Sequence, residues 1–208
     1  MEGSFLAVER VIIFTRYPEP GKTKTRLIPA LGPEGAARIQ RRMTERVVQM
    51  LRSLVPLRPV GMEIHFEGGG AALMAQWLGR DLLFCEQIPA DLGTRLQGAF
   101  ARGFGQGVRR VVIIGSDCPD LDQNIVNMAL DGLKDVDLVL GPAYDGGYYL
   151  IGLQKSVPQL FDGIPWGTAM VRKYTLERAR AQGLSILLLP TLADVDRPTD
   201  LPRAGLVW

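Results

Sequence analysis

The sequence has few of the residues that bind soft metal ions: it contains two cysteines and one histidine among 208 residues. Cys85 and Cys118 lie far apart, and no partner for His65 is evident from its neighbours. These spacings exclude the usual zinc motifs. Both cysteines fall in or next to apolar runs, where a free thiol behaves as a small hydrophobic side chain. The pattern therefore predicts reduced thiols, as in a cytoplasmic protein.

The sequence also lacks a long apolar run and a strong excess of charge. No stretch reaches the length of a membrane span, and the first residues do not have the pattern of a secretory signal. The formal net charge is only +2, which does not favour nucleic acid or an acidic membrane as a partner. We therefore expect a cytoplasmic protein that binds small molecules, and the sequence leaves a homo-oligomer open.

Short apolar runs alternate with longer stretches of helical period, which is typical of an α/β fold with a mainly parallel sheet. The chain length suits one domain, here residues 1–208. The predicted strands are Arg10–Thr15, Val60–Phe66, Asp81–Ile88, Arg110–Gly115, Val136–Leu140, Tyr148–Leu153 and Leu184–Leu189. The predicted helices are a long one from Pro33, then Ala71–Leu78, Gly93–Gly105, Asp122–Leu133 and Thr168–Gln182.

A basic loop follows the first predicted strand. Its residues Arg16, Gly21, Lys22, Lys24 and Arg26 combine cations with a glycine, a composition that suits a di- or triphosphate. The GKT triplet resembles a P-loop, but the first glycine of that motif would fall at Arg16, so a P-loop is not predicted. A solvated loop is the structural alternative. The position directly after a buried strand favours binding.

Carboxylates follow two of the predicted strands. Asp117 directly follows the strand at Arg110–Gly115, and Asp194 and Asp196 follow the last strand. Mg²⁺ takes one or two protein carboxylates together with phosphate oxygens, so Asp117 is a candidate ligand. Asp122 has a structural alternative as a helix cap.

A glycine-rich segment lies between two further predicted strands. Asp145, Gly146 and Gly147 fit a hairpin turn, which is the structure their residue types favour. The glycines would also leave space for a ligand, and Asp145 could then bind a sugar hydroxyl or act as a base. Trp166 fits packing better than stacking on a ligand.

Five segments together resemble one known family. They are similar, in this order, to the DUF2064 family, also described as transferase 1 associated with radical-SAM/selenodomain proteins. The segments are FTRYPEPGKTKTRL, GSDCPDL, GPAYDGGYYLIGL, FDGIPWGT and DVDRPTDL. The resemblance implies the nucleotide-diphospho-sugar transferase superfamily and a single-domain, Rossmann-like, three-layer sandwich of GT-A type. The family is also similar, more distantly, to guanylyltransferases.

The resemblance also implies roles for individual residues. The basic loop, with Arg16, Gly21, Lys22, Lys24 and Arg26, would bind the donor phosphates, and Asp117 and Asp196 would hold Mg²⁺ or Mn²⁺. Gly146 and Gly147 would bind on the acceptor or sugar side, together with Asp145. Asp117, Asp145 and Lys24 would act in catalysis. The expected function is glycosyl transfer from a nucleotide-diphospho-sugar to a small-molecule acceptor. The alternatives are nucleotidyl transfer from a nucleoside triphosphate to a phosphorylated small molecule, and a non-catalytic nucleotide-binding module.

Overall fold

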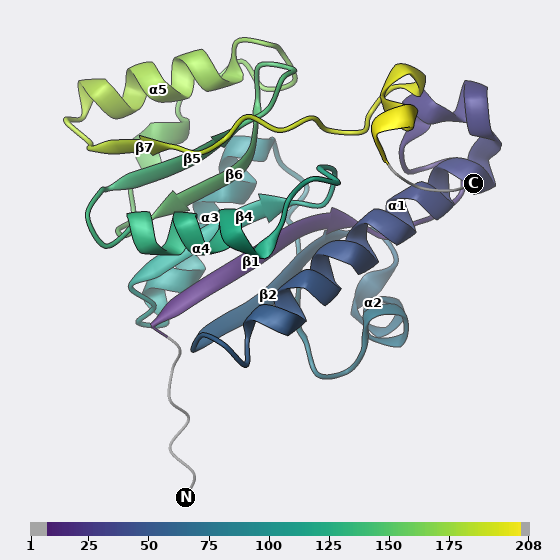
Figure 1. Cartoon of the computed structure of the whole chain (residues 1–208), viewed down its shortest axis with the longest axis horizontal. Helices are drawn as coiled ribbons and strands as arrows, with labels where there is room; N and C mark the ends of the chain where they lie inside the picture. The colour runs from purple at the N-terminus through teal and green to yellow at the C-terminus, as the bar shows by residue number, and fades with distance from the viewer. Residues whose placement is uncertain (1–7, 205–208) are drawn as a thin grey trace, which may run out of the picture.

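The computed structural model describes residues 8–204, so residues 1–7 and 205–208 of the predicted domain lie outside the described residues. Its centre is a seven-stranded sheet with the order β3-β2-β1-β4-β6-β5-β7 (Figure 1). The strands are β1 (Glu9–Arg16), β2 (Val60–Glu67), β3 (Leu83–Glu86), β4 (Arg110–Gly115), β5 (Leu138–Pro142), β6 (Tyr148–Leu153) and β7 (Ile186–Leu188). Each of the seven predicted runs overlaps one of these strands, and the predicted α/β fold is confirmed.

Strand β6 is the exception in an otherwise parallel sheet. It pairs antiparallel with both β4 and β5, and it lies between them. A tight turn joins β5 to β6, in which the Ala143 N–H donates to the carbonyl oxygen of Gly147 over 3.1 Å. The hairpin predicted at Asp145 is therefore confirmed. Strands β1 and β4 are parallel neighbours whose connections leave toward opposite halves of the sheet, which is where α/β proteins bind ligands.

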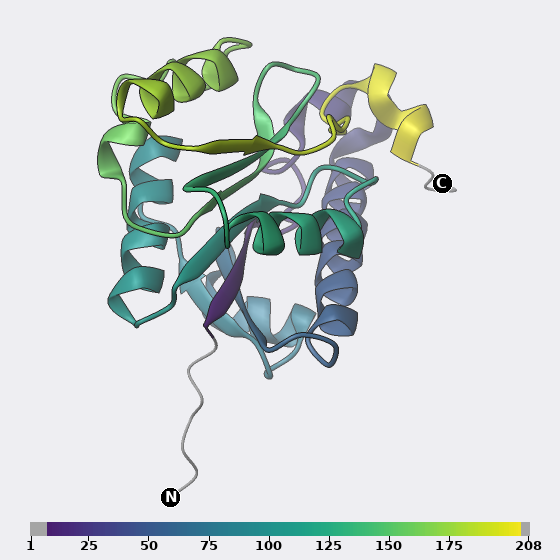
Figure 2. The same ribbon diagram turned by 60° about the vertical axis from the view of Figure 1, so that its left-hand side comes forward.

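Helices cover both faces of the sheet and make three layers. They are α1 (Ile28–Leu54), α2 (Gly70–Leu78), α3 (Leu92–Gly105), α4 (Gln123–Gly132) and α5 (Val171–Ala181). Helices α1, α2 and α4 pack on one face, and α3 and α5 pack on the other (Figure 2). Along β1, Val11 and Ile13 point to the first face and Ile12 to the second, as a strand buried on both sides requires. Among the described residues, no helix is long and apolar enough to cross a membrane.

Two sequence signals locate the ends of helices correctly. The backbone breaks at Gly32, where φ is 68°, so the regular part of α1 begins at Pro33 as predicted. Asp122 caps α4, because its Oδ1 accepts a hydrogen bond from the Ile125 N–H over 2.9 Å. The side chain of Asp122 is therefore used for structure.

A buried polar network joins β1, β2 and α3. Glu63 Oε1 accepts from Arg102 Nε at 2.8 Å and lies 3.2 Å from His65 Nε2, while Glu63 Oε2 accepts from Arg10 Nη1 at 3.1 Å. The His65 ring also stacks on Phe14 with a 5.5 Å centroid separation. His65, which had no partner in the sequence, thus belongs to the core. Its partner lies two residues away on the same side of β2.

This network should make stability depend on acid pH. Burial acts to raise the pKa of Glu63, but hydrogen bonds and charges from His65 and Arg102 outweigh it and lower the pKa from its ordinary 4.5 to about 2. Because the folded state holds the carboxylate ionised, its stabilisation is present above pH 4.5 and is lost as pH falls toward 2. The shift corresponds to about 3 kcal/mol.

We expect urea denaturation at a series of pH values to show this loss. Between pH 4.5 and 2, the free energy of unfolding of the wild type should fall by about 3 kcal/mol more than that of Glu63→Gln. Glu86→Gln, which changes an exposed carboxylate on β3, should follow the wild type. Parallel curves for the wild type and Glu63→Gln would contradict the assignment.

Candidate functional site

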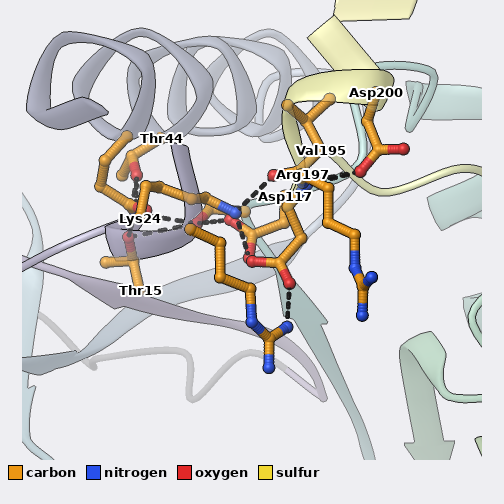
Figure 3. Close-up of polar contacts among 11 residues, drawn as sticks. Thr15, Lys24, Thr44, Asp117, Val195, Arg197 and Asp200 are labelled. Atoms are coloured by element: carbon orange, nitrogen blue, oxygen red, sulfur yellow. Dashed lines mark hydrogen bonds and ion pairs between the residues drawn. The ribbon is translucent and has the colours of Figure 1, made fainter. Parts of the chain in front are cut away.

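Lys24 occupies a strained and buried position in the basic loop. Its backbone is left-handed (φ 47°, ψ 42°), and among the described residues it is the one non-glycine with a positive φ. Such a conformation costs about 1–2 kcal/mol for a residue with a β-carbon. The side chain is only 4% exposed. Its Nζ donates to the carbonyl oxygen of Val195 at 2.7 Å and lies 2.9 Å from Asp117 Oδ2 (Figure 3). The strained backbone thus directs an ammonium group into the molecule.

The segment after β7, residues 190–197, crosses the carboxyl ends of β5 and β4. Leu192 forms a parallel bridge with Ala143, and the Val195 N–H donates to the carbonyl oxygen of Asp117 over 2.9 Å. We call this segment the crossing segment. It brings the late acidic residues to the end of β4, where Asp117 lies.

Asp196 of the crossing segment and Asp200 just beyond it have different partners. Asp196 Oδ2 forms an ion pair and a hydrogen bond with Arg26 Nη1. Asp200, in the short helix η3 (Pro198–Ala204), accepts from the Asp196 and Arg197 N–H groups at 3.2 and 2.7 Å. Asp196, the expected metal ligand, is therefore matched by a guanidinium in this structure. Its role as a metal ligand stays a prediction.

Asp194 is the acid that converges on Asp117 and Asp145. Burial is the main cause that raises its pKa, and the negative charges of Asp145 and Asp117 add to it, while Lys24 opposes the change. The same three carboxylates, with burial as the main cause, raise the pKa of the Cys118 thiol. Asp145 and Asp117 therefore lie close enough to disfavour the charge of Asp194.

This acidic cluster suits a hard divalent cation. Carboxylate oxygens are the ligands that Mg²⁺ and Mn²⁺ prefer, and burial together with the charges of Asp145 and Asp117 disfavours the ionised form of Asp194, which a nearby cation would offset. A second group, Glu63, His65 and Cys85, places ligand-type atoms within 4.8 Å of one another. In that group the oxygens of Glu63 already bind Arg10 and Arg102, so the charge is balanced without a metal.

Two cavities meet at the Lys24–Asp117 pair. Cavity 1, of about 410 Å³, lies at the ends of β1 and β2 and has a basic wall and a hydroxyl- and amide-lined floor. Its polar lining residues are Thr15, Arg16, Thr23, Lys24, Thr25, Arg26, Gln40, Glu67, Gln87, Arg95, Ser116, Asp117 and Asp196. At the floor, Thr15 Oγ1 lies 2.8 Å from Thr44 Oγ1 and 3.3 Å from Ser116 Oγ (Figure 3).

Cavity 2, of about 670 Å³, lies beyond the pair, at the β5–β6 turn and the crossing segment. It combines carboxylates with aromatic rings: its lining includes Asp117, Tyr144, Asp145, Gly147, Tyr148, Tyr149, Trp166, Asp194, Asp196 and Arg197. Arg26, Leu92, Asp117 and Asp196 line both cavities. A ligand in cavity 1 would therefore adjoin a ligand in cavity 2 at these four residues.

The structure separates the residues of the predicted basic loop. Arg16, Lys24 and Arg26 line cavity 1, whereas Gly21 and Lys22 line neither cavity. Lys22 Nζ instead pairs with Glu19 Oε1 at 2.8 Å. Arg16 Nη1 donates to the carbonyl oxygen of Lys22 at 3.1 Å, so the outer part of the loop supports the inner part.

The glycines of the β5–β6 turn have different tasks. The Gly147 N–H donates to Asp145 Oδ1 over 2.8 Å and thereby orients that carboxylate. Gly146 has a φ of 92°, and a β-carbon there would lie 2.1 Å from the carbonyl oxygen of Ala169. Gly146 therefore serves the close approach of the turn to the loop before α5. Asp145 is the member of the turn that faces cavity 2 with a charge.

The sequence interpretation left out several residues of the site. The sequence prediction names Asp196 and not Asp194 as a ligand, and it does not include Glu67. Glu67 ends β2, as Asp117 follows β4, so the rule that ligands bind at strand ends could have identified it. The polar floor of cavity 1, with Thr15 and Gln40, carries no local signal, because its members come from different elements.

Solved structures and curated proteins resemble this chain over most of its length. A protein of Desulfovibrio desulfuricans G20, provisionally described as a nucleotide-diphospho-sugar transferase, is 39% identical, covers 92% of this chain and 83% of its own, and has a TM-score of 0.86. The 2-phospho-L-lactate guanylyltransferase of Methanopyrus kandleri is 28% identical over 194 residues, which are 92% of this chain and 89% of the relative.

A more distant structure shares the fold alone. The glucosyl-3-phosphoglycerate synthase of Mycobacterium tuberculosis, solved with Mn²⁺, uridine diphosphate and glucosyl-3-phosphoglycerate, is 14% identical with a TM-score of 0.58, over 94% of this chain and 74% of its own. The family model for DUF2064, described as an uncharacterized protein conserved in bacteria, matches residues 50–168. That range is more than half of the chain, and the chain therefore belongs to the DUF2064 family.

Proposed function

We propose that this protein transfers a glycosyl group from a nucleotide-diphospho-sugar to a small-molecule acceptor and uses Mg²⁺ or Mn²⁺. The observation that carries the proposal is the meeting of two chemically different cavities at Asp117, which pairs with Lys24. Cavity 1 offers cations for a diphosphate, and cavity 2 offers carboxylates and aromatic rings for sugar and acceptor.

The donor's diphosphate would lie at the boundary of the cavities. Lys24 and Arg26 both line cavity 1 there, and each now neutralises an aspartate. A diphosphate would compete with these aspartates for the two cations. When Arg26 turns to the diphosphate, Asp196 becomes available beside Asp117 and Asp194. The bound metal would offset the charge that develops on the leaving nucleoside diphosphate.

The sugar and the acceptor would occupy cavity 2. Carboxylates accept hydrogen bonds from hydroxyl groups, and the rings of Tyr144 and Trp166 offer flat apolar faces. Asp145 would accept the proton of the acceptor hydroxyl, while the oxygen of that hydroxyl forms a bond to the anomeric carbon of the sugar. The bond from that carbon to the diphosphate oxygen breaks, and the nucleoside diphosphate leaves with the electron pair.

Nucleotidyl transfer is the second candidate, and the guanylyltransferase relative favours it. In that reaction an acceptor oxygen in cavity 2 attacks the α-phosphorus of a triphosphate at the boundary, and pyrophosphate leaves. The two reactions use the same cations but release different products. A non-catalytic nucleotide-binding module would release neither.

The products therefore decide between the candidates. The full chain is incubated with Mn²⁺ and either a panel of nucleotide-diphospho-sugars or a panel of nucleoside triphosphates, with phosphorylated and unphosphorylated small molecules as acceptors. Release of a nucleoside diphosphate together with a glycosylated product supports the proposal. Release of pyrophosphate supports nucleotidyl transfer. Metal-dependent binding without turnover of any donor would favour the binding module.

Replacing the acid at the end of β4 should abolish transfer without unfolding the protein. Asp117→Asn keeps an oxygen that can accept from Lys24 but removes the charge, so we expect kcat to fall about 100-fold or more. The thermal midpoint should change by only a few degrees. Asp120→Asn, an exposed acid three residues on, is the control and should keep its activity. Undiminished turnover in Asp117→Asn would refute the metal assignment.

The two lysines of the loop should differ in donor affinity. Lys24→Met removes a cation from cavity 1, and we expect the donor Kd, measured by calorimetry on protein shown to be folded, to rise about 10-fold or more. Lys22→Met should have a smaller effect, because Lys22 pairs with Glu19 outside the cavities. Lys134→Met, which removes an exposed ion pair with Asp131, is the control. Equal losses in both loop variants would show that the loop rearranges around the donor.

A further inference from the structure

Glu67 presents a partly free carboxylate on the wall of cavity 1. It ends β2 and is 41% exposed. Arg16 Nη2 bonds its Oε2 at 2.7 Å, and Arg95 Nη1 bonds the same oxygen at 3.0 Å. Within the described part of the chain, both hydrogen bonds of this carboxylate fall on Oε2. Its other oxygen, Oε1, is left to accept from a ligand.

The two arginines keep this carboxylate ionised and in place. Partial burial acts to raise the pKa of Glu67, but the hydrogen bonds and charges of Arg16 and Arg95 outweigh it and hold the pKa below its usual value. Arg95 is itself fixed, because its Nε donates to the carbonyl oxygen of Ala90 at 2.7 Å. An ionised carboxylate only accepts hydrogen bonds, so the group of the ligand that faces it must be a donor.

We infer that Glu67 recognises the base of the donor nucleotide and that it selects guanine. Guanine carries two adjacent donors, N1–H and the 2-amino group, beside the acceptor O6. Oε1 can accept from both donors, because a carboxylate oxygen has two lone-pair sites, and the neighbouring guanidinium groups can donate to O6. This arrangement matches the Watson–Crick edge of guanine, which presents the 2-amino donor, the N1–H donor and the O6 acceptor in that order.

The other common bases do not match this wall. Uracil offers one N–H between two carbonyl oxygens, which would face the negative charge of Glu67. Cytosine and adenine each offer one amino group beside a ring-nitrogen acceptor, so one of the two contacts would be repulsive. A group that is left unpaired against a fixed charge costs far more than a lost contact.

The same wall is connected to the phosphate-binding end of the cavity. Arg16 contacts Glu67 with one nitrogen and the carbonyl oxygen of Lys22 with the other. Base recognition and loop position therefore share one side chain. The inference rests on the proposed function only in that a nucleotide occupies cavity 1, and it holds equally for glycosyl and nucleotidyl transfer.

The test is calorimetric titration of the full chain, with Mn²⁺, against the diphosphates of guanosine, inosine, adenosine, uridine and cytidine. Inosine lacks only the 2-amino group. We expect guanosine diphosphate to bind most tightly, inosine diphosphate about 10-fold more weakly, and the other three more weakly still. In Glu67→Gln the affinity for guanosine diphosphate should fall about 10-fold or more, while the other three should not lose affinity.

Glu86→Gln, an exposed acid at the neighbouring strand end, is the matched control and should keep the guanine preference. Circular dichroism establishes that each variant is folded. Equal binding of all five diphosphates, or a guanine preference that survives Glu67→Gln, would overturn the assignment to Glu67 and leave the proposed transfer intact. Binding of none of them would overturn the proposed function together with it.

Discussion

The contact of Lys24 with Asp117 and Val195 joins the basic loop after β1 to the end of β4 and to the crossing segment. A buried ammonium is strongly destabilising unless charge and hydrogen bonds compensate it, and here a carboxylate and a carbonyl oxygen do so. The loop after β1, the end of β4 and the crossing segment must therefore be arranged at once for any one of them to be stable. The left-handed backbone of Lys24 is tolerated because this arrangement determines it. Asp117, one partner in this contact, lines both cavities.

The strands and helices followed from local patterns, and the structure confirms them. The central strands β1, β4, β5 and β6 are buried between two layers, so their composition carries the information by itself. The hairpin at Asp145 and the cap at Asp122 were also predictable, because each depends on residues no more than four positions apart. The partners of His65 were not recognised, although one is only two residues away, since a single Glu-x-His pattern is common in strands.

The location of the candidate site could be predicted from the sequence, but the ion pairs between its residues could not. Strand ends and a basic loop indicated where ligands would bind, and the structure brings Lys24, Arg26 and Asp117 together there. The pairing of Arg26 with Asp196 spans 170 positions, and no local pattern reports it. Whether Asp194 or Asp196 turns toward Asp117 depends on backbone rotations of the crossing segment, which the spacing of two residues does not determine. The functional roles themselves remain predictions.

The position of β6 has a consequence for how the chain is synthesised. The strands β2, β1 and β4 can pair as soon as residue 115 is made, yet the outer edge of β4 has no partner until β6 is complete at residue 153. That edge belongs to the apolar run RVVIIG, and an uncovered edge of this kind is a template for intermolecular pairing. The β5–β6 hairpin, which closes locally and quickly, then supplies the partner. Until β6 is made, the nascent sheet is therefore exposed to aggregation through the free edge of β4, a strand that lies at the centre of the finished sheet.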